Sequence, residues 1–342
     1  MSYKPAITSM SLGRAWVHQL APKIAAARGF AGIEVFYEDL EYHARSLPGG
    51  LSDQTLLETA REFRTLCDEQ GLTIIALQPF LHYEGLLDRE EHGRRIEKLH
   101  LWFQIARILG TDTIQVPSNF LPADVITDDL ETVVSDLRKI ADLGLQQTPT
   151  PIRFAYENIC WGTFVNKWEQ LWQIVATVDR PNFGMCLDTF HIAGGEWADP
   201  AREDGRVNDH ADKLLQRSLD KMVRTIDSSK IFYVQLVDGE RLESPLTPGH
   251  PFWVDGQPAR MSWSRNARVF AFEERGYMPV LKVLRALVDP PPRGLGYKGW
   301  ISLELFSRTM AESGDQVPFE HAQRGLNSWN RVVQAMGWEQ EV

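Results

Sequence analysis

Residues 113–157, TIQVPSNFLPADVITDDLETVVSDLRKIADLGLQQTPTPIRFAYE, contain two β-rich runs separated by a segment with helical periodicity. The apolar residues of the middle segment recur at the spacing of one helix face: Leu130, Val133, Leu137 and Ile140. Thr127 and Asp128 precede this face and Gly144 follows it, as is typical where a helix starts and ends. A strand, a crossover helix and a second strand form the repeating unit of a parallel sheet.

The same alternation recurs along the chain and predicts eight strands, at residues 6–10, 33–37, 73–78, 113–116, 152–157, 183–188, 231–237 and 300–305. Such a chain closes into a barrel or forms an open doubly wound sheet. No GxGxxG motif follows the first strand, which argues against a dinucleotide-binding sheet. The 342 residues suit the closed form, so we expect an α/β fold with a single (β/α)₈ TIM-barrel domain over residues 1–342.

Composition restricts the class of protein further. The chain is 43% hydrophobic and 24% charged, has no run of eighteen apolar residues and begins without a signal-peptide pattern, so no membrane partner is expected. Its net charge of -10 disfavours a nucleic-acid partner, which usually requires a basic face. Three widely separated cysteines, Cys67, Cys160 and Cys186, fit a reducing compartment. We therefore expect a cytoplasmic enzyme, and a homo-oligomer is compatible with this composition.

Four late strands each carry one strong oxygen ligand near the carboxyl end, where the active sites of barrels lie: Glu157, Asp188, Gln235 and Glu304. Three carboxylates and one amide carbonyl suit a hard divalent cation, here Mn²⁺, Mg²⁺ or Co²⁺. The alternative is that each acid pairs with a nearby Arg or Lys. The surrounding strand segments contain few basic residues, and unpaired buried carboxylates are costly, so the sequence favours a metal site.

Two further residues are candidates for proton transfer. His191 follows Asp188 by three positions, in backbone expected to be extended or turned, and a histidine can move protons at neutral pH. Glu34 lies in the second strand, although alternation alone does not choose between it, Glu38 and Asp39. His82, after the third strand, is a second candidate near the pocket.

The long connection between residues 238 and 298 is expected to be a loop on the catalytic face. It contains ARMSWSRNAR (residues 259–268), in which Ser264 and Arg268 are candidates for substrate binding and Arg265 is expected to matter less if it faces solvent. Because an arginine fork matches a carboxylate, this segment could anchor an anionic substrate or act as a lid.

Several motifs together resemble the 3-dehydroshikimate dehydratases of quinate catabolism, in their fungal form, within the xylose-isomerase-like barrels. They are AITSMSLG, LQPF, YEGLLDREEH, QVPSNFLPA, MCLDTFHIAG, VQLVDGE, PARMSWSRNAR and SLELF. The resemblance implies a divalent-metal enzyme that converts 3-dehydroshikimate to protocatechuate and water. It also implies that the four oxygen ligands bind the metal, that His191 is catalytic, and that Ser264 and Arg268 bind substrate. Some relatives have histidine in place of Gln235.

Three alternatives remain. A sugar or inositol-type isomerase or epimerase would use the same metal-binding barrel, without a carboxylate anchor. An endonuclease IV-like enzyme would need many histidine ligands and a basic groove, whereas this chain has nine histidines and is acidic. A metal-binding barrel without catalysis would leave His191 and Arg268 without a role.

Overall fold

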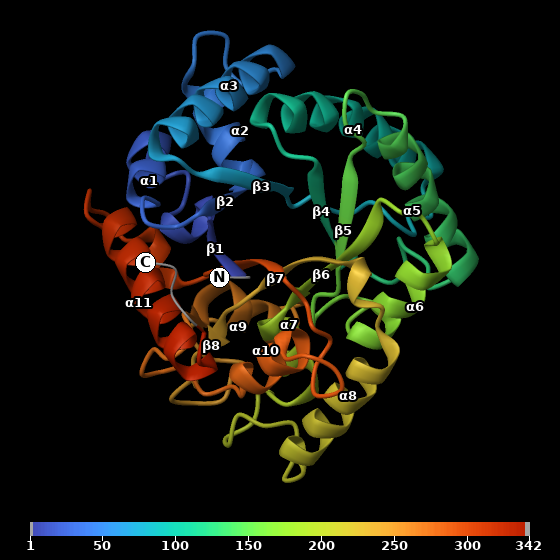
Figure 1. Ribbon diagram of the computed structural model, residues 1–342, viewed down its shortest axis with the longest axis vertical. Coiled ribbons are helices and arrows are strands. Elements are labelled where there is room, and N and C mark those ends of the chain that lie inside the picture. Colours follow the sequence, from blue (N-terminus) through green and yellow to red (C-terminus); the bar gives the residue numbers. More distant parts are fainter. Residues whose placement is uncertain (1–2, 339–342) are drawn as a thin grey trace.

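The computed structural model describes residues 3–338 and contains a closed parallel barrel surrounded by helices (Figure 1). Around the barrel the strands follow the order β1-β10-β7-β6-β5-β4-β3-β2. Their bounds are Tyr3–Thr8 (β1), Gly32–Phe36 (β2), Thr73–Gln78 (β3), Thr113–Pro117 (β4), Arg153–Glu157 (β5), Phe183–Asp188 (β6), Ile231–Gln235 (β7) and Gly299–Leu303 (β10). The predicted (β/α)₈ barrel is therefore confirmed.

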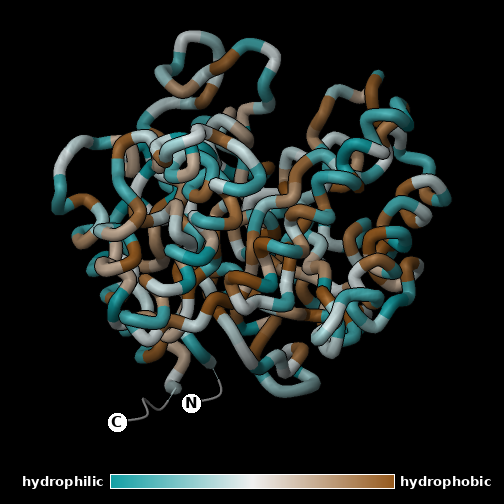
Figure 2. The backbone as a smooth tube through the Cα atoms, turned by 90° about the horizontal axis from the view of Figure 1, so that it is seen from above, coloured by the Kyte–Doolittle hydropathy of each residue, from teal (hydrophilic) through white to brown (hydrophobic). Residues whose placement is uncertain are grey.

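The helices surround the barrel, and their buried apolar side chains form one core with the strands and with neighbouring helices. Brown and teal alternate along the chain in Figure 2. They are Leu20–Ala26 (α1), Tyr37–Ser46 (α2), Asp53–Gln70 (α3), Arg89–Leu109 (α4), Leu130–Leu145 (α5), Trp168–Val178 (α6), Thr189–Glu196 (α7), Ala211–Thr225 (α8), Ala259–Ala267 (α9), Val280–Val288 (α10) and Val317–Met336 (α11). Within residues 3–338, no helix is long and apolar enough to cross a bilayer.

Three predicted strands end two residues earlier in the structure. The first begins at Tyr3 and stops at Thr8, because Ser9–Leu12 forms a 3₁₀ helix. The seventh stops at Gln235, and the last stops at Leu303, so that Glu304 lies just beyond its strand.

The connection after β7 was expected to be a loop, and that expectation is wrong. It contains α9, α10 and a short antiparallel ribbon of Asp238–Gly239 (β8) and Arg268–Val269 (β9). Trp263 of α9 is fully buried, and its indole N–H donates to the carbonyl of Glu240 (2.8 Å). Its ring lies so close to Gly239 that a Cβ there would be 2.2 Å from the indole. This packing, rather than helix periodicity, orders the segment.

Glu84 joins loops at the catalytic end of the barrel. Its Oε1 accepts the N–H of Asn119 (2.6 Å) and the hydroxyl of Tyr156 (3.0 Å), so the loop after β3 is tied to the segment after β4 and to β5. Burial raises the pKa of Glu84 to about 7, against the opposing effect of these hydrogen bonds.

We expect a Glu84→Gln variant to gain stability relative to the wild type as the pH rises from about 5 to 7. In this window the folded wild type keeps a proton that the unfolded chain has lost, so its stability falls by up to about 1.4 kcal/mol per pH unit. Glutamine has no proton to lose. Urea unfolding of both proteins between pH 5 and 8 measures the difference, and a pH-independent difference would contradict the assignment.

Candidate active site

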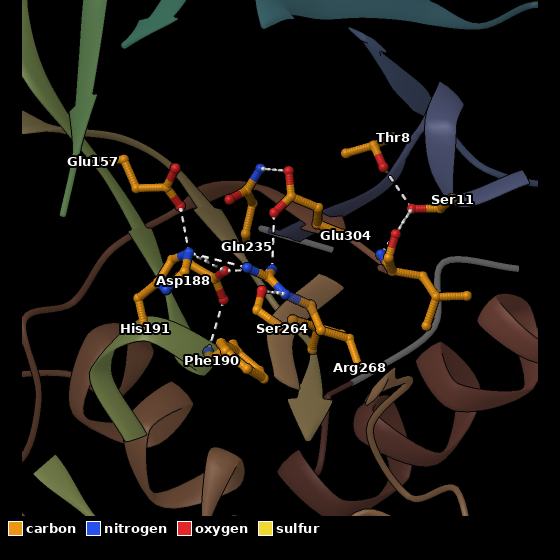
Figure 3. Close-up of polar contacts among 12 residues, drawn as sticks. Thr8, Ser11, Glu157, Asp188, Phe190, His191, Gln235, Ser264, Arg268 and Glu304 are labelled. Carbon is orange, nitrogen blue, oxygen red and sulfur yellow. Dashed lines mark hydrogen bonds and ion pairs between the residues drawn. The ribbon is translucent and has the colours of Figure 1, made fainter. Parts of the chain in front are cut away.

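The carboxyl ends of four neighbouring strands bring the predicted oxygen ligands together. Glu157 ends β5, Asp188 ends β6, Gln235 ends β7 and Glu304 directly follows β10. Asp188 pairs with Gln235 in the strand register, so both lie at the same level of the barrel. Near Glu304, the Ser11 hydroxyl accepts the N–H of Leu305 (2.8 Å) and fixes the following backbone (Figure 3).

Local backbone structure explains why Asp188 and His191 face the same site. Asp188 is the N-cap of α7, and its Oδ1 accepts the N–H of Phe190 (2.7 Å). His191 therefore lies in the first helical turn rather than in the extended or turned backbone expected from the sequence. Its Nε2 is 3.5 Å from Asp188 Oδ2 and 3.8 Å from Glu157 Oε1 (Figure 3).

The arrangement of oxygen atoms fits a divalent cation. Among residues 3–338, Glu157 Oε1 and Gln235 Oε1 are buried and find no hydrogen-bond partner. Potential ligand atoms of Glu157, Asp188 and His191 lie within 4.8 Å of one another. Burial first, and then neighbouring carboxylates, raise the pKa of Glu157 well above its usual value. A bound cation would satisfy the free oxygens and offset this repulsion.

Two glutamines that the sequence analysis missed hold these carboxylates in place. The Gln78 side-chain amide donates to Glu34 (2.8 Å) and to Glu304 (2.9 Å). The Gln115 amide donates to Glu157 Oε2. In the sequence, each of these glutamines is a polar residue in a mainly apolar strand, and that pattern could have marked Gln78 and Gln115 as candidate site residues.

Glu34 belongs to the same buried network. It is fully buried in β2 and accepts the Gln235 side-chain amide at 3.1 and 3.2 Å. Burial first, and the charge of Glu304 second, raise the pKa of Glu34 to about 8, so this carboxyl carries a proton at neutral pH. Its predicted catalytic role stays a prediction.

Arg268 enters the cluster from β9. Its Nη1 lies 2.9 Å from both Asp188 Oδ2 and Glu304 Oε2, and its Nε donates to Ser264 Oγ (2.9 Å). Its Nη2 lies 3.0 Å from His191 Nε2. Burial first, and Arg268 second, lower the pKa of His191 well below its ordinary value, so this imidazole is neutral and able to accept a proton.

A cavity of about 140 Å³ opens above this cluster. Its polar lining includes His191, Ser264, Arg268, Glu157 and Glu304. Aromatic and aliphatic side chains enclose the remainder: Phe36, Leu81, Phe120, Ile159, Trp161 and Phe306. We call it the reaction cavity. A few convergent polar groups in an otherwise apolar pocket are typical of a small-molecule site.

His82 lies outside this arrangement. It lines a neighbouring cavity of about 490 Å³, and its Nδ1 is 3.3 Å from Asn119 Oδ1. The structure therefore brings His191, Ser264 and Arg268 together with the four oxygen ligands, and it places His82 beside them.

The closed barrel and its cluster of carboxylates at the strand ends define the class of protein, a parallel barrel with buried acids that could hold a metal ion. Residues 22–330 match the model of the xylose isomerase-like TIM barrel family, and the chain belongs to that family.

Two proteins with similar sequences are 3-dehydroshikimate dehydratases. The chain is 51% identical over 345 residues to a 3-dehydroshikimate dehydratase of Neurospora crassa, covering 98% of this chain and 94% of that protein. A 3-dehydroshikimate dehydratase of Pseudomonas aeruginosa is 30% identical over 82% of this chain, which spans about a third of that protein (35%). Among solved structures, a xylose isomerase-like TIM barrel/4-hydroxyphenylpyruvate dioxygenase fusion protein superposes with a TM-score of 0.71 at 26% identity. The superposition covers 99% of this chain and 45% of the fusion protein.

Proposed function

We propose that this protein is a 3-dehydroshikimate dehydratase, a hydro-lyase that converts 3-dehydroshikimate to protocatechuate and water. The observation that carries the proposal is the 51% identity, over nearly the full length, to a curated enzyme of that name. The reaction cavity supports it, because a neutral histidine lies beside a set of carboxylates suited to a cation.

Glu157, Asp188, Gln235 and Glu304 would hold the divalent cation, with Mn²⁺, Mg²⁺ and Co²⁺ as the candidates. When bound, such a cation acts as a Lewis acid that stabilises negative charge developing on the substrate ketone. The buried free oxygens of Glu157 and Gln235 support this assignment.

His191 is assigned as the base that removes the proton next to the ketone. The neighbouring ring hydroxyl leaves with one proton as water. A second ring proton is then lost and the former ketone oxygen gains one, so the ring becomes aromatic and the net change is the release of one molecule of water. The lowered pKa of His191 keeps its ring available to accept a proton at neutral pH. Ser264 and Arg268 line the cavity and are proposed to contact the substrate near its reacting groups.

The proposed setting is quinate and shikimate catabolism in the cytoplasm. Three buried free thiols, Cys67, Cys160 and Cys186, support a reducing compartment.

The direct test is incubation of the purified protein with 3-dehydroshikimate and Mn²⁺ or Mg²⁺. We expect the ultraviolet absorbance of protocatechuate to appear as 3-dehydroshikimate is consumed. A parallel incubation with neutral ketoses serves as the control for the isomerase alternative. Isomerised ketose without any aromatic product would overturn the proposal.

A further inference from the structure

The guanidinium of Arg268 is already engaged by the protein. Arginine has five N–H donors, and the neighbours of Arg268 occupy four of them. Nη1 faces Asp188 and Glu304, Nε donates to Ser264, and Nη2 faces His191. Only one N–H of Nη2 remains for any ligand.

The two faces of this guanidinium are also flanked by rings. Its Cζ lies 4.4 Å from the ring centroid of Phe190 and 4.9 Å from that of Phe306. A carboxylate held by a bidentate fork needs two parallel N–H groups, which Arg268 no longer offers. Arg268 is thus suited to hold Asp188, Glu304 and His191 in place, which leaves a bidentate contact with a substrate carboxylate to a second cation.

The neighbouring cavity supplies such cations. It shares Phe36, Pro79, Leu81, Arg265 and Phe306 with the reaction cavity, so the two adjoin. Its lining contains four permanently basic side chains and only two acids: Arg14, Arg95, Lys98 and Arg265 against Glu38 and Glu41. This local excess of positive charge stands out in a chain whose net charge is -10.

Arg265 is the basic residue that lines both cavities. Its one hydrogen bond among the described residues runs from Nη1 to Gln257 Oε1 (2.9 Å), so most of its fork is unused. Arg265 and Arg14 both line the neighbouring cavity, and burial first, then the charge of Arg14, lower the pKa of Arg265. Within residues 3–338, neither arginine has a carboxylate within 4.0 Å.

The other two cations have partners of their own. Arg95 pairs with Glu91 (2.8 Å), and Lys98 lies over the ring of Tyr37 (4.8 Å to the centroid). Arg14 packs on Trp16 and Phe306, and its Nη1 contacts the sulfur of Met10. Burial lowers the pKa of Arg14, against the smaller opposing effect of the charges of Glu38 and Asp39. Arg265 is therefore the cation of this cavity whose fork is least engaged, and Arg14 lines the same cavity.

We propose that Arg265, assisted by Arg14, binds the carboxylate of the substrate where the two cavities meet. The inference rests on the dehydratase function proposed above. In 3-dehydroshikimate the carboxylate lies across the ring from the carbon that loses its proton. A ring that presents this carbon to His191 extends its carboxylate away from the metal-binding cluster, and Arg265 lines the same cavity.

The test compares the binding of 3,4-dihydroxybenzoate with that of its amide, 3,4-dihydroxybenzamide, by the Mn²⁺-loaded protein. The two probes share a ring and hydroxyls and differ in the charge that Arg265 would recognise. We expect the wild type to bind the acid about tenfold or more tightly than the amide. Arg265→Gln should remove most of this preference, and Arg14→Gln should remove a smaller part.

Arg61→Gln, an exposed substitution on α3, is the matched control for loss of one positive charge and should keep the wild-type preference. With 3-dehydroshikimate, Arg265→Gln should mainly raise KM, because an anchor remote from the reacting carbons binds ground and transition states alike. An unchanged acid-to-amide preference in Arg265→Gln overturns the inference, even when the wild type turns over 3-dehydroshikimate. If the wild type does not turn over 3-dehydroshikimate at all, the proposed function is overturned too, and with it the inference that rests on it.

Discussion

Removal of divalent cations is expected to abolish turnover of 3-dehydroshikimate, and addition of Mn²⁺ or Mg²⁺ is expected to restore it. The reason is the concentration of acids in the reaction cavity, where burial and neighbouring carboxylates raise the pKa values of Glu157 and Asp188, the latter to about 7. The experiment dialyses the protein against a chelator and then measures metal content, by elemental analysis, and activity on the same samples. Full activity at a metal content far below one ion per chain would contradict it.

A binding measurement makes the metal prediction independent of catalysis. The melting temperature of wild-type protein should rise with metal concentration, since a ligand of the folded state stabilises it by mass action. Glu157→Gln keeps the shape of the side chain and removes its charge, so this shift should shrink strongly. Glu84→Gln is the matched control, because Glu84 is an equally buried glutamate whose partners are Asn119 and Tyr156.

The convergence of Glu157, Asp188, Gln235 and Glu304 could be predicted because it depends on strand periodicity and chain direction, whereas their role as metal ligands stays a prediction. In a parallel barrel every strand delivers its last residues to the same face. Glu157, Asp188 and Gln235 are the final residues of their strands, and Glu304 follows its strand by one position. Neither a remote contact nor an exact helix boundary was needed to find them.

The predictions that failed or fell short depend on contacts between distant residues. The serine- and arginine-rich segment has no regular apolar periodicity, and it is helical because Trp263 packs on Gly239. The ion pairs of Arg268 join residues that are 80 and 36 positions apart, and no local pattern reports them. For the same reason the sequence analysis did not foresee that the donors of Arg268 face Asp188, Glu304 and His191, and its predicted role in substrate binding stays a prediction.

Replacement of His191 by alanine is expected to lower kcat by about 10²- to 10⁴-fold, the usual contribution of a positioned general base, with little change in KM. The imidazole is fully enclosed, with the backbone N–H of Cys160 at Nδ1 (3.2 Å) and Arg268 beside Nε2. Both ring nitrogens thus face donors, an environment that disfavours the imidazolium, because that form carries an N–H group on each nitrogen.

The metal content of the His191→Ala protein separates the two roles that the geometry allows. His191 lies close enough to Glu157 and Asp188 to serve as a third ligand, whereas we assign it as a base. A base-only role predicts metal content and metal-induced stabilisation near those of the wild type, together with the loss of kcat. His100→Ala removes an exposed histidine from α4 and should leave both quantities unchanged. If the His191 variant loses its metal along with its activity, the imidazole is a ligand, and a different group must take the proton from the substrate.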